Sequence, residues 1–276
     1  MNLTKEAPRM MSLDEPKAFE LVHARSIDDA LGRWESERTT AYLAGGCDLL
    51  DQVKQQWHNP LRIIDLKPID ALRAFDTPGP TIRLGALTTL TAIERDARIR
   101  TAATALAQAA ERVATLQIRN RGTIGGNLLQ DGRCPYYRGP WRCYRAGGIV
   151  CDAFHGINAE HALFGASRCY IVSPSDTAVA LVALDAQVTV ADPRGRRAMP
   201  VEALFVGTEE DILHLHRLHD GSILADVRID TARRRRSAFR KATMRGAWEF
   251  ALTSIAVSHV DGRDWRVVAG GVAAVP

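Results

Sequence analysis

The sequence of 276 residues contains no apolar run that could form a membrane-spanning helix. Such a helix needs about 18 or more consecutive apolar residues, and every apolar stretch here is interrupted sooner by polar or charged residues. The first residues, Met1–Pro8, are polar and lack the apolar stretch of a secretory signal. We therefore expect a protein without a membrane span that is made in the cytoplasm, where cysteine thiols stay reduced.

The sequence also lacks the marks of a nucleic-acid reader. Its formal net charge is only +4, and the arginine run at 233–236 is accompanied by neither interleaved aromatic residues nor zinc-finger spacing. A short basic run is more often a solvated loop or strand edge than a contact with phosphates. The 46% hydrophobic and 25% charged residues are typical of a globular protein with an ample core. We expect no nucleic-acid partner.

Cysteine is scarce, yet four of the five cysteines fall within residues 134–169 in the pattern C-x8-C-x7-C-x17-C. The reducing compartment and the large core disfavour disulfides, and the tight cysteine pairs of structural zinc sites are absent. Four widely spaced thiolates suit a 4Fe-4S cluster; buried thiols that pack as small hydrophobic residues are the alternative. The predicted cluster ligands are Cys134, Cys143, Cys151 and Cys169. The fifth cysteine, Cys47, is interpreted as a packing residue.

Two glycine-rich loops stand at junctions between predicted elements. The first, Gly45-Gly46, joins a strand to a helix that starts near Asp48, and the second occupies residues 122–127. Glycines let successive backbone N–H groups approach an anion, although a plain turn is the commoner explanation of a lone Gly-Gly pair. Together the loops suit the diphosphate of a dinucleotide. The G-x-G-x-x-G pattern of doubly wound nucleotide folds is missing, so we expect a different architecture.

Hydrophobic periodicity and turn residues predict a mixed order of strands and helices. Strands are expected at 19–22, 42–44, 61–66, 81–87, 187–191, 238–245 and 267–272, with an edge strand at 221–229. Helices are expected at 27–37, from 48, and at 88–96, 101–114, 177–184 and 249–257. Asp176 suits either a ribose contact or the cap of the following helix, and Lys241 suits either a ligand contact or the surface.

Several segments resemble one family, the FAD-binding medium subunits of the molybdenum hydroxylases, which include xanthine dehydrogenase and carbon monoxide dehydrogenase. The similar segments are Leu43–Leu50, Arg119–Asn127, Pro174–Asp176 and Gly270–Ala273. The cysteines and the run Arg133–Tyr137 are most similar to the 4Fe-4S-containing flavin subunit of periplasmic aldehyde oxidoreductase, and more loosely to that of 4-hydroxybenzoyl-CoA reductase.

The resemblance implies an α+β fold of the vanillyl-alcohol-oxidase (PCMH) type with two α/β subdomains and a short C-terminal α/β domain like that of the carbon monoxide dehydrogenase flavoprotein. It implies an N-terminal arm at 1–17, an FAD-binding domain at 18–230 with subdomains at 18–67 and 68–230, and a truncated C-terminal domain at 237–276. Residues 131–170, called the Cys-rich segment below, form an insertion. Relatives continue beyond the position that corresponds to Pro276.

The same resemblance implies FAD and a 4Fe-4S cluster as cofactors. Residues carried over as FAD contacts are Ala41, Tyr42, Leu43, Ala44, Gly45, Gly46, Cys47, Asp48, Leu49, Thr123, Ile124, Gly125, Gly126, Asn127, Asp176 and Lys241. Relatives usually have Thr or Ser at the position of Cys47, so a side-chain hydrogen bond to phosphate is weakened here while the backbone contacts remain. No catalytic residue is implied.

The implied role is electron transfer within a heterotrimer. A large subunit with the molybdenum cofactor oxidises an aldehyde or N-heterocycle, a small subunit with two 2Fe-2S clusters relays electrons, and FAD in this chain passes them to an external acceptor. A partner with a twin-arginine signal could carry the folded chain to the periplasm. The rival interpretations are a zinc-stabilised, non-catalytic binding module and a self-contained flavin oxidase, which the lack of an evident substrate base disfavours.

Overall fold

A computed structural model describes residues 16–76 and 79–276. Most of the arm expected at 1–17 lies outside the described residues. The N-terminal unit alternates strands and helices: β1 (Glu20–His23), α1 (Ile27–Gly32), β2 (Thr40–Leu43), α2 (Leu49–Lys54) and β3 (Arg62–Asp65). Its three strands pair in parallel in the order β1-β3-β2. This confirms the predicted βαβαβ-like arrangement, which places the first glycine loop at the carboxyl end of β2.

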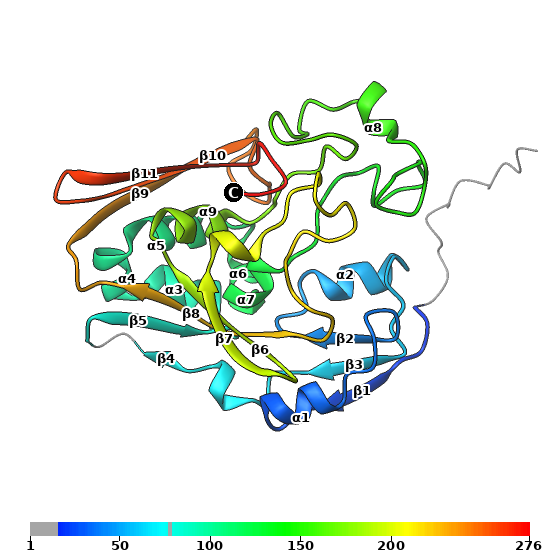
Figure 1. Cartoon of the computed structure of the whole chain (residues 1–276), viewed down its shortest axis with the longest axis horizontal. Helices are drawn as coiled ribbons and strands as arrows, with labels where there is room; N and C mark the ends of the chain where they lie inside the picture. The colour runs from blue at the N-terminus through cyan, green and yellow to red at the C-terminus, as the bar shows by residue number, and fades with distance from the viewer. Residues whose placement is uncertain (1–15, 77–78) are drawn as a thin grey trace, which may run out of the picture.

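A five-stranded antiparallel sheet forms the middle of the molecule (Figure 1). Its strands are β4 (Phe75–Asp76), β5 (Thr81–Gly85), β6 (Gln187–Asp192), β7 (Gly195–Pro200) and β8 (Ile223–Asp230), in the order β4-β5-β8-β6-β7. The expected edge strand at 221–229 is therefore wrong, because β8 lies between β5 and β6. Its polar Asp226 is accommodated there by ion pairs with Arg83 and Arg228 and a hydrogen bond from Thr189.

Six of the described helices lie on one face of this sheet, and most of these six share a hydrophobic core with β5, β6 and β8. They are α3 (Leu90–Arg95), α4 (Ala97–Ala102), α5 (Thr104–Glu111), α6 (Leu116–Arg121), α7 (Ile124–Leu128) and α9 (Asp176–Ala183). The helix expected at 101–114 is split at Ala103, whose φ of −136° and ψ of 50° leave the helical region. Every residue of α9 is buried, as expected for a helix that is apolar all round.

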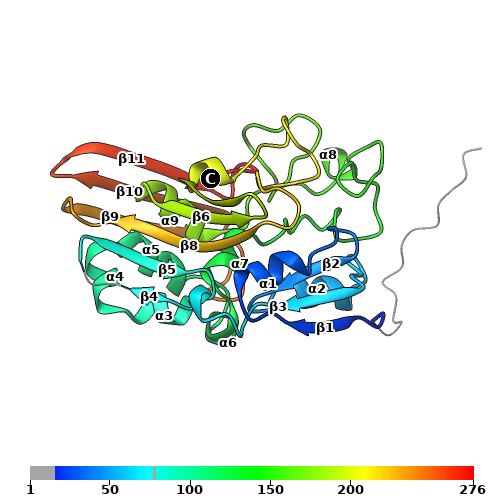
Figure 2. The same cartoon turned by 60° about the horizontal axis from the view of Figure 1, so that its bottom comes forward.

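The C-terminal sheet consists of β9 (Arg235–Ala242), β10 (Thr253–Val260) and β11 (Arg263–Gly270) in the antiparallel order β11-β10-β9. The helix expected at 249–257 is wrong, because β10 alternates buried and exposed side chains with the period of a strand. The small buried residues Ser254, Ala256 and Ser258 belong to this strand. Within the described residues, α5 and α9 from earlier in the chain pack against the sheet (Figure 2).

The Cys-rich segment contains one short helix, α8 (Asp152–His155), and is otherwise loop. Figures 1 and 2 show it beside the N-terminal unit and the loop that precedes β8. The remaining short elements are the 3-10 helices η1 (Asp70–Leu72) and η2 (Glu202–Leu204). Across the described part of the chain, no helix combines the length and apolarity needed to cross a bilayer.

Candidate cofactor site

A cavity of about 980 Å³ lies where the N-terminal unit, the second glycine loop and the C-terminal segment meet. Most of the residues predicted to contact a cofactor line it, namely Ala41, Tyr42, Ala44, Gly45, Gly46, Cys47, Asp48, Leu49, Thr123, Gly125, Gly126, Asn127, Asp176 and Lys241. Leu43 and Ile124 do not line it, because their side chains pack into two hydrophobic clusters. The volume and the mixed polar and apolar walls suit a large organic cofactor.

The two glycine loops contact each other through their backbones. A methyl group at Gly45 would come within 2.1 Å of the carbonyl oxygen of Arg121, the last residue of α6, and within 3.2 Å of Gly122, the first residue of the second loop. Gly46 has φ +80°, a conformation that side chains disfavour. Glycine is therefore required at both positions, the first for close approach and the second for its backbone angle.

The backbone donors of the two loops differ in availability. The N–H groups of Gly45–Asp48 donate no hydrogen bond to any described residue. Those of Ile124 and Gly125 donate to the carbonyl oxygens of Thr88 and Ala86, both at 2.9 Å. The N–H groups of residues 126 and 127 bond to Thr123, through its hydroxyl at 3.1 Å and its carbonyl at 2.8 Å. The first loop is thus the one that presents free backbone donors to an anion.

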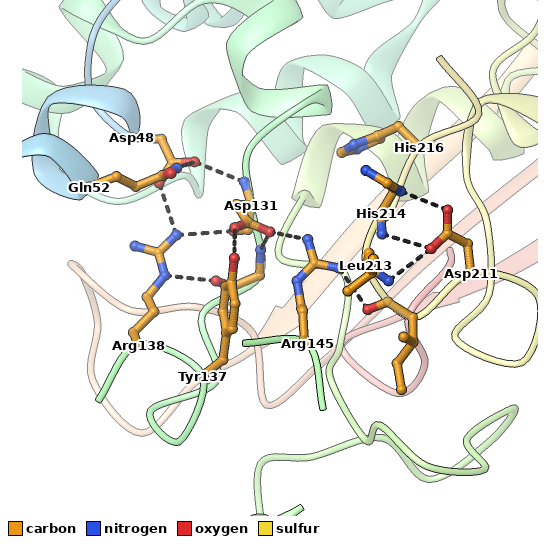
Figure 3. Close-up of polar contacts among 12 residues, drawn as sticks. Asp48, Gln52, Asp131, Tyr137, Arg138, Arg145, Asp211, Leu213, His214 and His216 are labelled. Carbon is orange, nitrogen blue, oxygen red and sulfur yellow. Dashed lines mark hydrogen bonds and ion pairs between the residues drawn. The ribbon is translucent and has the colours of Figure 1, made fainter. Parts of the chain in front are cut away.

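Asp48 occupies the N-cap position of α2 but makes no capping hydrogen bond there. Its carboxylate instead accepts from Arg138 Nη2 at 3.0 Å, from the backbone N–H of Asp131 at 2.8 Å and from Gln52 Nε2 at 3.0 Å (Figure 3). Arg133 Nη2 lies 2.8 Å from the same carboxylate. Asp48 therefore joins the phosphate-type loop to the Cys-rich segment, a contact that the sequence did not indicate.

Asp131 anchors the Cys-rich segment from inside. Its carboxylate accepts from Arg145 Nη2 at 2.6 Å and from the Tyr137 hydroxyl at 2.8 Å, as Figure 3 shows. Burial raises the pKa of Asp131, but Arg145 and the hydrogen bonds outweigh burial and hold it below its usual value. Arg145 also donates to the carbonyl oxygen of Ile212 at 3.3 Å. This buried ion pair therefore ties the segment to the loop that precedes β8.

A buried ion pair closes another wall of the cavity. Lys241 Nζ lies 2.6 Å from Asp176 Oδ2, and both side chains are almost fully buried. Burial raises the pKa of Asp176, whereas the ammonium group of Lys241 opposes that shift. Lys241 also donates to the carbonyl oxygen of Glu249. The cap of α9 is Ser175, whose side chain accepts from the N–H of Ala178, so Asp176 is not the cap.

Asn127, from the second loop, is held by two hydroxyls. Ser175 Oγ and Thr177 Oγ1 donate to its Oδ1 at 2.9 Å and 2.6 Å. All three residues are buried, and two donors on one oxygen determine which end of the amide is Oδ1. The sequence signal for this arrangement is the short polar run at the start of α9. That run suggested a role for Asp176 but none for Ser175 or Thr177.

Cys47 makes long contacts only, 4.0 Å from its Sγ to the carbonyl oxygen of Gly45 and 3.9 Å to that of Ile118. Burial raises its pKa above the usual thiol value, so it stays protonated near neutral pH. Cys47 lines the cavity as well as packing between the two loops.

The remaining cysteines, Cys134, Cys143, Cys151 and Cys169, lie close enough for the charge of one thiolate to raise the pKa of another. Burial raises the pKa of Cys134, the N–H groups of two following residues lower it, and Cys143 and Cys151 raise it further. Burial likewise raises the pKa of Cys169 to about 11, with Cys143 and Cys134 adding to the shift. Within residues 16–76 and 79–276, however, no group of three or more His, Cys, Asp or Glu side chains is arranged to hold a metal ion. The predicted cluster is therefore not confirmed.

The surroundings of these thiols suit a thiolate-bound group in part. Cys134 Sγ lies 3.2 Å from His161 Nε2, and His161 Nδ1 is buried without a hydrogen-bond partner among the described residues. Burial raises the pKa of Cys134, Cys143 and Cys169, and backbone N–H groups near each sulfur offset part of that rise. Such N–H groups favour sulfur in its charged form.

The histidines of the loop before β8 have separate structural roles. His216 is partly buried, with Nε2 2.9 Å from the carbonyl oxygen of Leu128, and desolvation by its surroundings lowers its pKa to about 4. His214 pairs with Asp211 at 2.7 Å (Figure 3). It also pairs with Glu37 at 3.4 Å. The hydrogen bond to Asp211 raises the pKa of His214.

Taken together, two apposed glycine loops, a wall with a buried ion pair and a large cavity between α/β units define a dinucleotide-cofactor-binding subunit. Residues 17–231 match the family model described as the FAD binding domain in molybdopterin dehydrogenase. The chain belongs to this family, and it is accordingly an FAD-binding oxidoreductase component.

Relatives with known activities agree with this assignment. The chain is 34% identical over 241 residues to the aldehyde oxidoreductase FAD-binding subunit PaoB of Escherichia coli, a match that covers 85% of this chain and 75% of that subunit. It is 27% identical over 217 residues to the carbon monoxide dehydrogenase medium chain of Hydrogenophaga pseudoflava, covering 78% of this chain and 59% of that one.

Solved structures share the fold. A carbon monoxide dehydrogenase chain from Hydrogenophaga pseudoflava superposes with a TM-score of 0.71 at 24% identity, covering 94% of this chain and 77% of that chain. A quinoline 2-oxidoreductase chain from Pseudomonas putida gives a TM-score of 0.69 at 20% identity, covering 94% and 76%. The predicted α+β FAD-binding fold is thereby confirmed.

Proposed function

We propose that this chain is the flavin electron-transfer subunit of a heterotrimeric molybdenum hydroxylase that oxidises an aldehyde or an N-heterocycle. The observation that carries the proposal is the first glycine loop, whose unbonded N–H groups face a cavity large enough for FAD. The relatives include an aldehyde oxidoreductase subunit and a nicotinate dehydrogenase subunit, which supports this range of substrates.

The residues around the cavity fit FAD. The N–H groups of Gly45–Asp48 would bind the diphosphate, and Thr123 and Asn127 would contact it from the second loop. Asp176 and Lys241 would contact the ribose or flavin part on the opposite wall. Bound FAD would supply the redox chemistry by accepting and passing on electrons.

The proposed partners are a large subunit with the molybdenum cofactor and a small subunit with two 2Fe-2S clusters, with an external electron acceptor. The names of the relatives support a multi-subunit assembly, since they are described as medium chains or FAD-binding subunits. We place the assembly in the cytoplasm, unless a partner with a twin-arginine signal exports it folded.

We further propose that Cys134, Cys143, Cys151 and Cys169 bind a 4Fe-4S cluster that braces or modulates the Cys-rich segment. Two facts support this: Cys134, Cys143 and Cys169 each have a pKa that is raised by burial and further by at least one other cysteine of the set, and backbone N–H groups lie near these three sulfurs. The segment is an insertion in the domain scheme proposed above, with subdomains at 18–67 and 68–230.

The visible spectrum of anaerobically purified protein tests both cofactors. We expect a yellow-brown protein that releases free flavin on acid precipitation and contains about four irons per chain. Cys143→Ser should lower the iron content but leave the flavin in place. A colourless protein that contains zinc and takes up no added FAD would instead identify a zinc-stabilised binding module. Full iron content in Cys143→Ser would remove that residue from the ligand set.

A further inference from the structure

We propose that Arg133, supplied by the Cys-rich segment, binds the diphosphate of FAD in the large cavity. This inference rests on the proposed FAD site and adds to it a cation that neither glycine loop provides. Arg133 immediately precedes Cys134, so it would also link the cofactor cavity directly to the cysteines.

Arg133 is held at the cavity from two sides. Its Nη2 lies 2.8 Å from Asp48 Oδ1, in the first loop, and its guanidinium carbon lies 5.1 Å from the ring centroid of Phe250, in the C-terminal segment. The aromatic ring attracts a guanidinium group placed over its face, and stacking on the ring restricts the orientation of the planar guanidinium. Its side chain is 24% exposed, and it lines the cavity.

The hydrogen-bonding capacity of Arg133 is not used up by these contacts. Its Nε is buried and has no hydrogen-bond partner among the described residues, and its Nη1 comes no nearer than 4.0 Å to Asp51. A buried donor of a charged group without a partner is costly, so native proteins usually supply one. Lys241, which also lines the cavity, already uses its three N–H donors on Asp176 and on the carbonyl oxygens of Arg112 and Glu249.

A second arginine of the Cys-rich segment, Arg138, balances the negative charge of Asp48 and Asp51. Asp48 stands beside the free N–H groups of the first loop, where an unpaired carboxylate would repel an anionic ligand. Arg138 bonds Asp48 at 3.0 Å and Asp51 at 3.4 Å, and it does not line the cavity. Arg138 therefore neutralises the carboxylates from outside, which leaves the guanidinium of Arg133 available to a ligand.

A diphosphate is the ligand that this arrangement fits. Gly45–Asp48 and Arg133 line the same cavity, and the guanidinium of Arg133 contacts the side chain of Asp48, the last residue of the first loop, at 2.8 Å. Backbone donors and a planar guanidinium are the two groups that proteins use most for phosphate oxygens. Of the parts of FAD, only the diphosphate carries negative charge that these donors would bind; the isoalloxazine and adenine rings are uncharged.

The test measures binding of FAD and of ADP, which carries the diphosphate without the flavin, to the full chain prepared free of flavin. Quenching of flavin fluorescence gives the dissociation constant for FAD, and competition gives that for ADP. Arg133→Gln should weaken both ligands by about tenfold or more, the loss expected for one charge-assisted hydrogen bond. Arg133→Lys should recover part of the affinity. The control is Arg142→Gln, in the same segment but 74% exposed and paired with Asp152.

Several results would overturn the proposal. Unchanged ADP affinity in Arg133→Gln would place Arg133 at the flavin ring, and unchanged affinity for both ligands would leave it a structural residue. Full recovery by adding Asp48→Asn to Arg133→Gln would mean that Arg133 only neutralises Asp48. If Arg133→Gln fails to fold, as judged by circular dichroism, the pair Asp48→Asn with Arg133→Gln, which removes both charges of the ion pair, decides: ADP affinity equal to that of Asp48→Asn alone would contradict a phosphate contact. Failure of the wild-type chain to bind FAD would instead refute the proposed function.

Discussion

At the scale of single residues, the site depends on the missing side chain of Gly45 and on the fixed orientation of the Asn127 amide. Gly45 allows the loops to touch, and Asn127 is held by two hydroxyls. Neither feature involves charge, so each can be tested without altering the electrostatics of the cavity.

Gly45→Ala should separate the two loops. The new methyl group would sit 2.1 Å from the carbonyl oxygen of Arg121, which is backbone and cannot rotate away. We expect a loss of about 1–3 kcal/mol in the free energy of unfolding, together with weaker FAD binding. Urea unfolding and flavin titration would measure both. Gly32→Ala, where no atom lies within 4 Å, should leave both unchanged, and an unaffected Gly45→Ala would contradict the close contact.

Thr177→Val removes one hydroxyl that holds Asn127 while keeping the side-chain shape. The buried Oδ1 then keeps only the donor from Ser175, which should cost about 1–3 kcal/mol of stability and weaken FAD binding because the amide can turn. The matched control is Thr189→Val, a buried threonine bonded to Asp226 in the five-stranded sheet. It should lower stability without changing flavin affinity; equal effects on flavin in both variants would refute the positioning role.

At the scale of elements, the loop before β8 is joined to α7 by the partly buried imidazole of His216, whose Nε2 contacts the carbonyl oxygen of Leu128. Its pKa of about 4 lies below the value of about 6.5 in an unfolded chain, so the unfolded chain binds more protons between these values. The stability that this residue contributes is present above pH 6.5 and is lost as the pH falls toward 4. The expected loss is about 3 kcal/mol by pH 4.

Urea unfolding at pH 7 and pH 5 measures this effect. We expect the wild-type chain to lose more stability between these pH values than His216→Gln, whose amide is uncharged at both. His214, whose pKa is raised by Asp211, shifts in the opposite direction, so His214→Gln is the control and should not reduce the loss. An equal pH dependence in wild type and His216→Gln would show that His216 is not the responsible group.

Elements also show where sequence patterns are sufficient. The strand, Gly-Gly and helix order of the N-terminal unit was predictable, because local turn residues and short apolar runs determine it. The region 249–257 was not, because the buried face of β10 consists of the small residues Ser254, Ala256 and Ser258, whereas the larger apolar residues Ile255 and Val257 lie on its other face. Its state is decided by pairing with β9 and β11, which no local pattern encodes.

At the scale of the whole molecule, the cavity is assembled from parts that are far apart in the chain. The two loops that line it were identifiable as glycine-rich motifs, whereas Arg133 and Arg138 reach Asp48 across more than 80 residues. The sequence signal was the arginine content of the Cys-rich segment, whose meaning depends on the docking of that segment beside α2 (Figure 1). The spacing of residues along the sequence does not predict where a long loop packs against distant parts of the chain.

The backbone contact between Gly45 and Arg121 has a consequence for which molecules can enter. Because the two loops touch through main-chain atoms, their separation at the cavity wall is set by peptide geometry and not by adjustable side chains. A ligand that contacts both loops must therefore fit a spacing that no change of side-chain rotamer can widen.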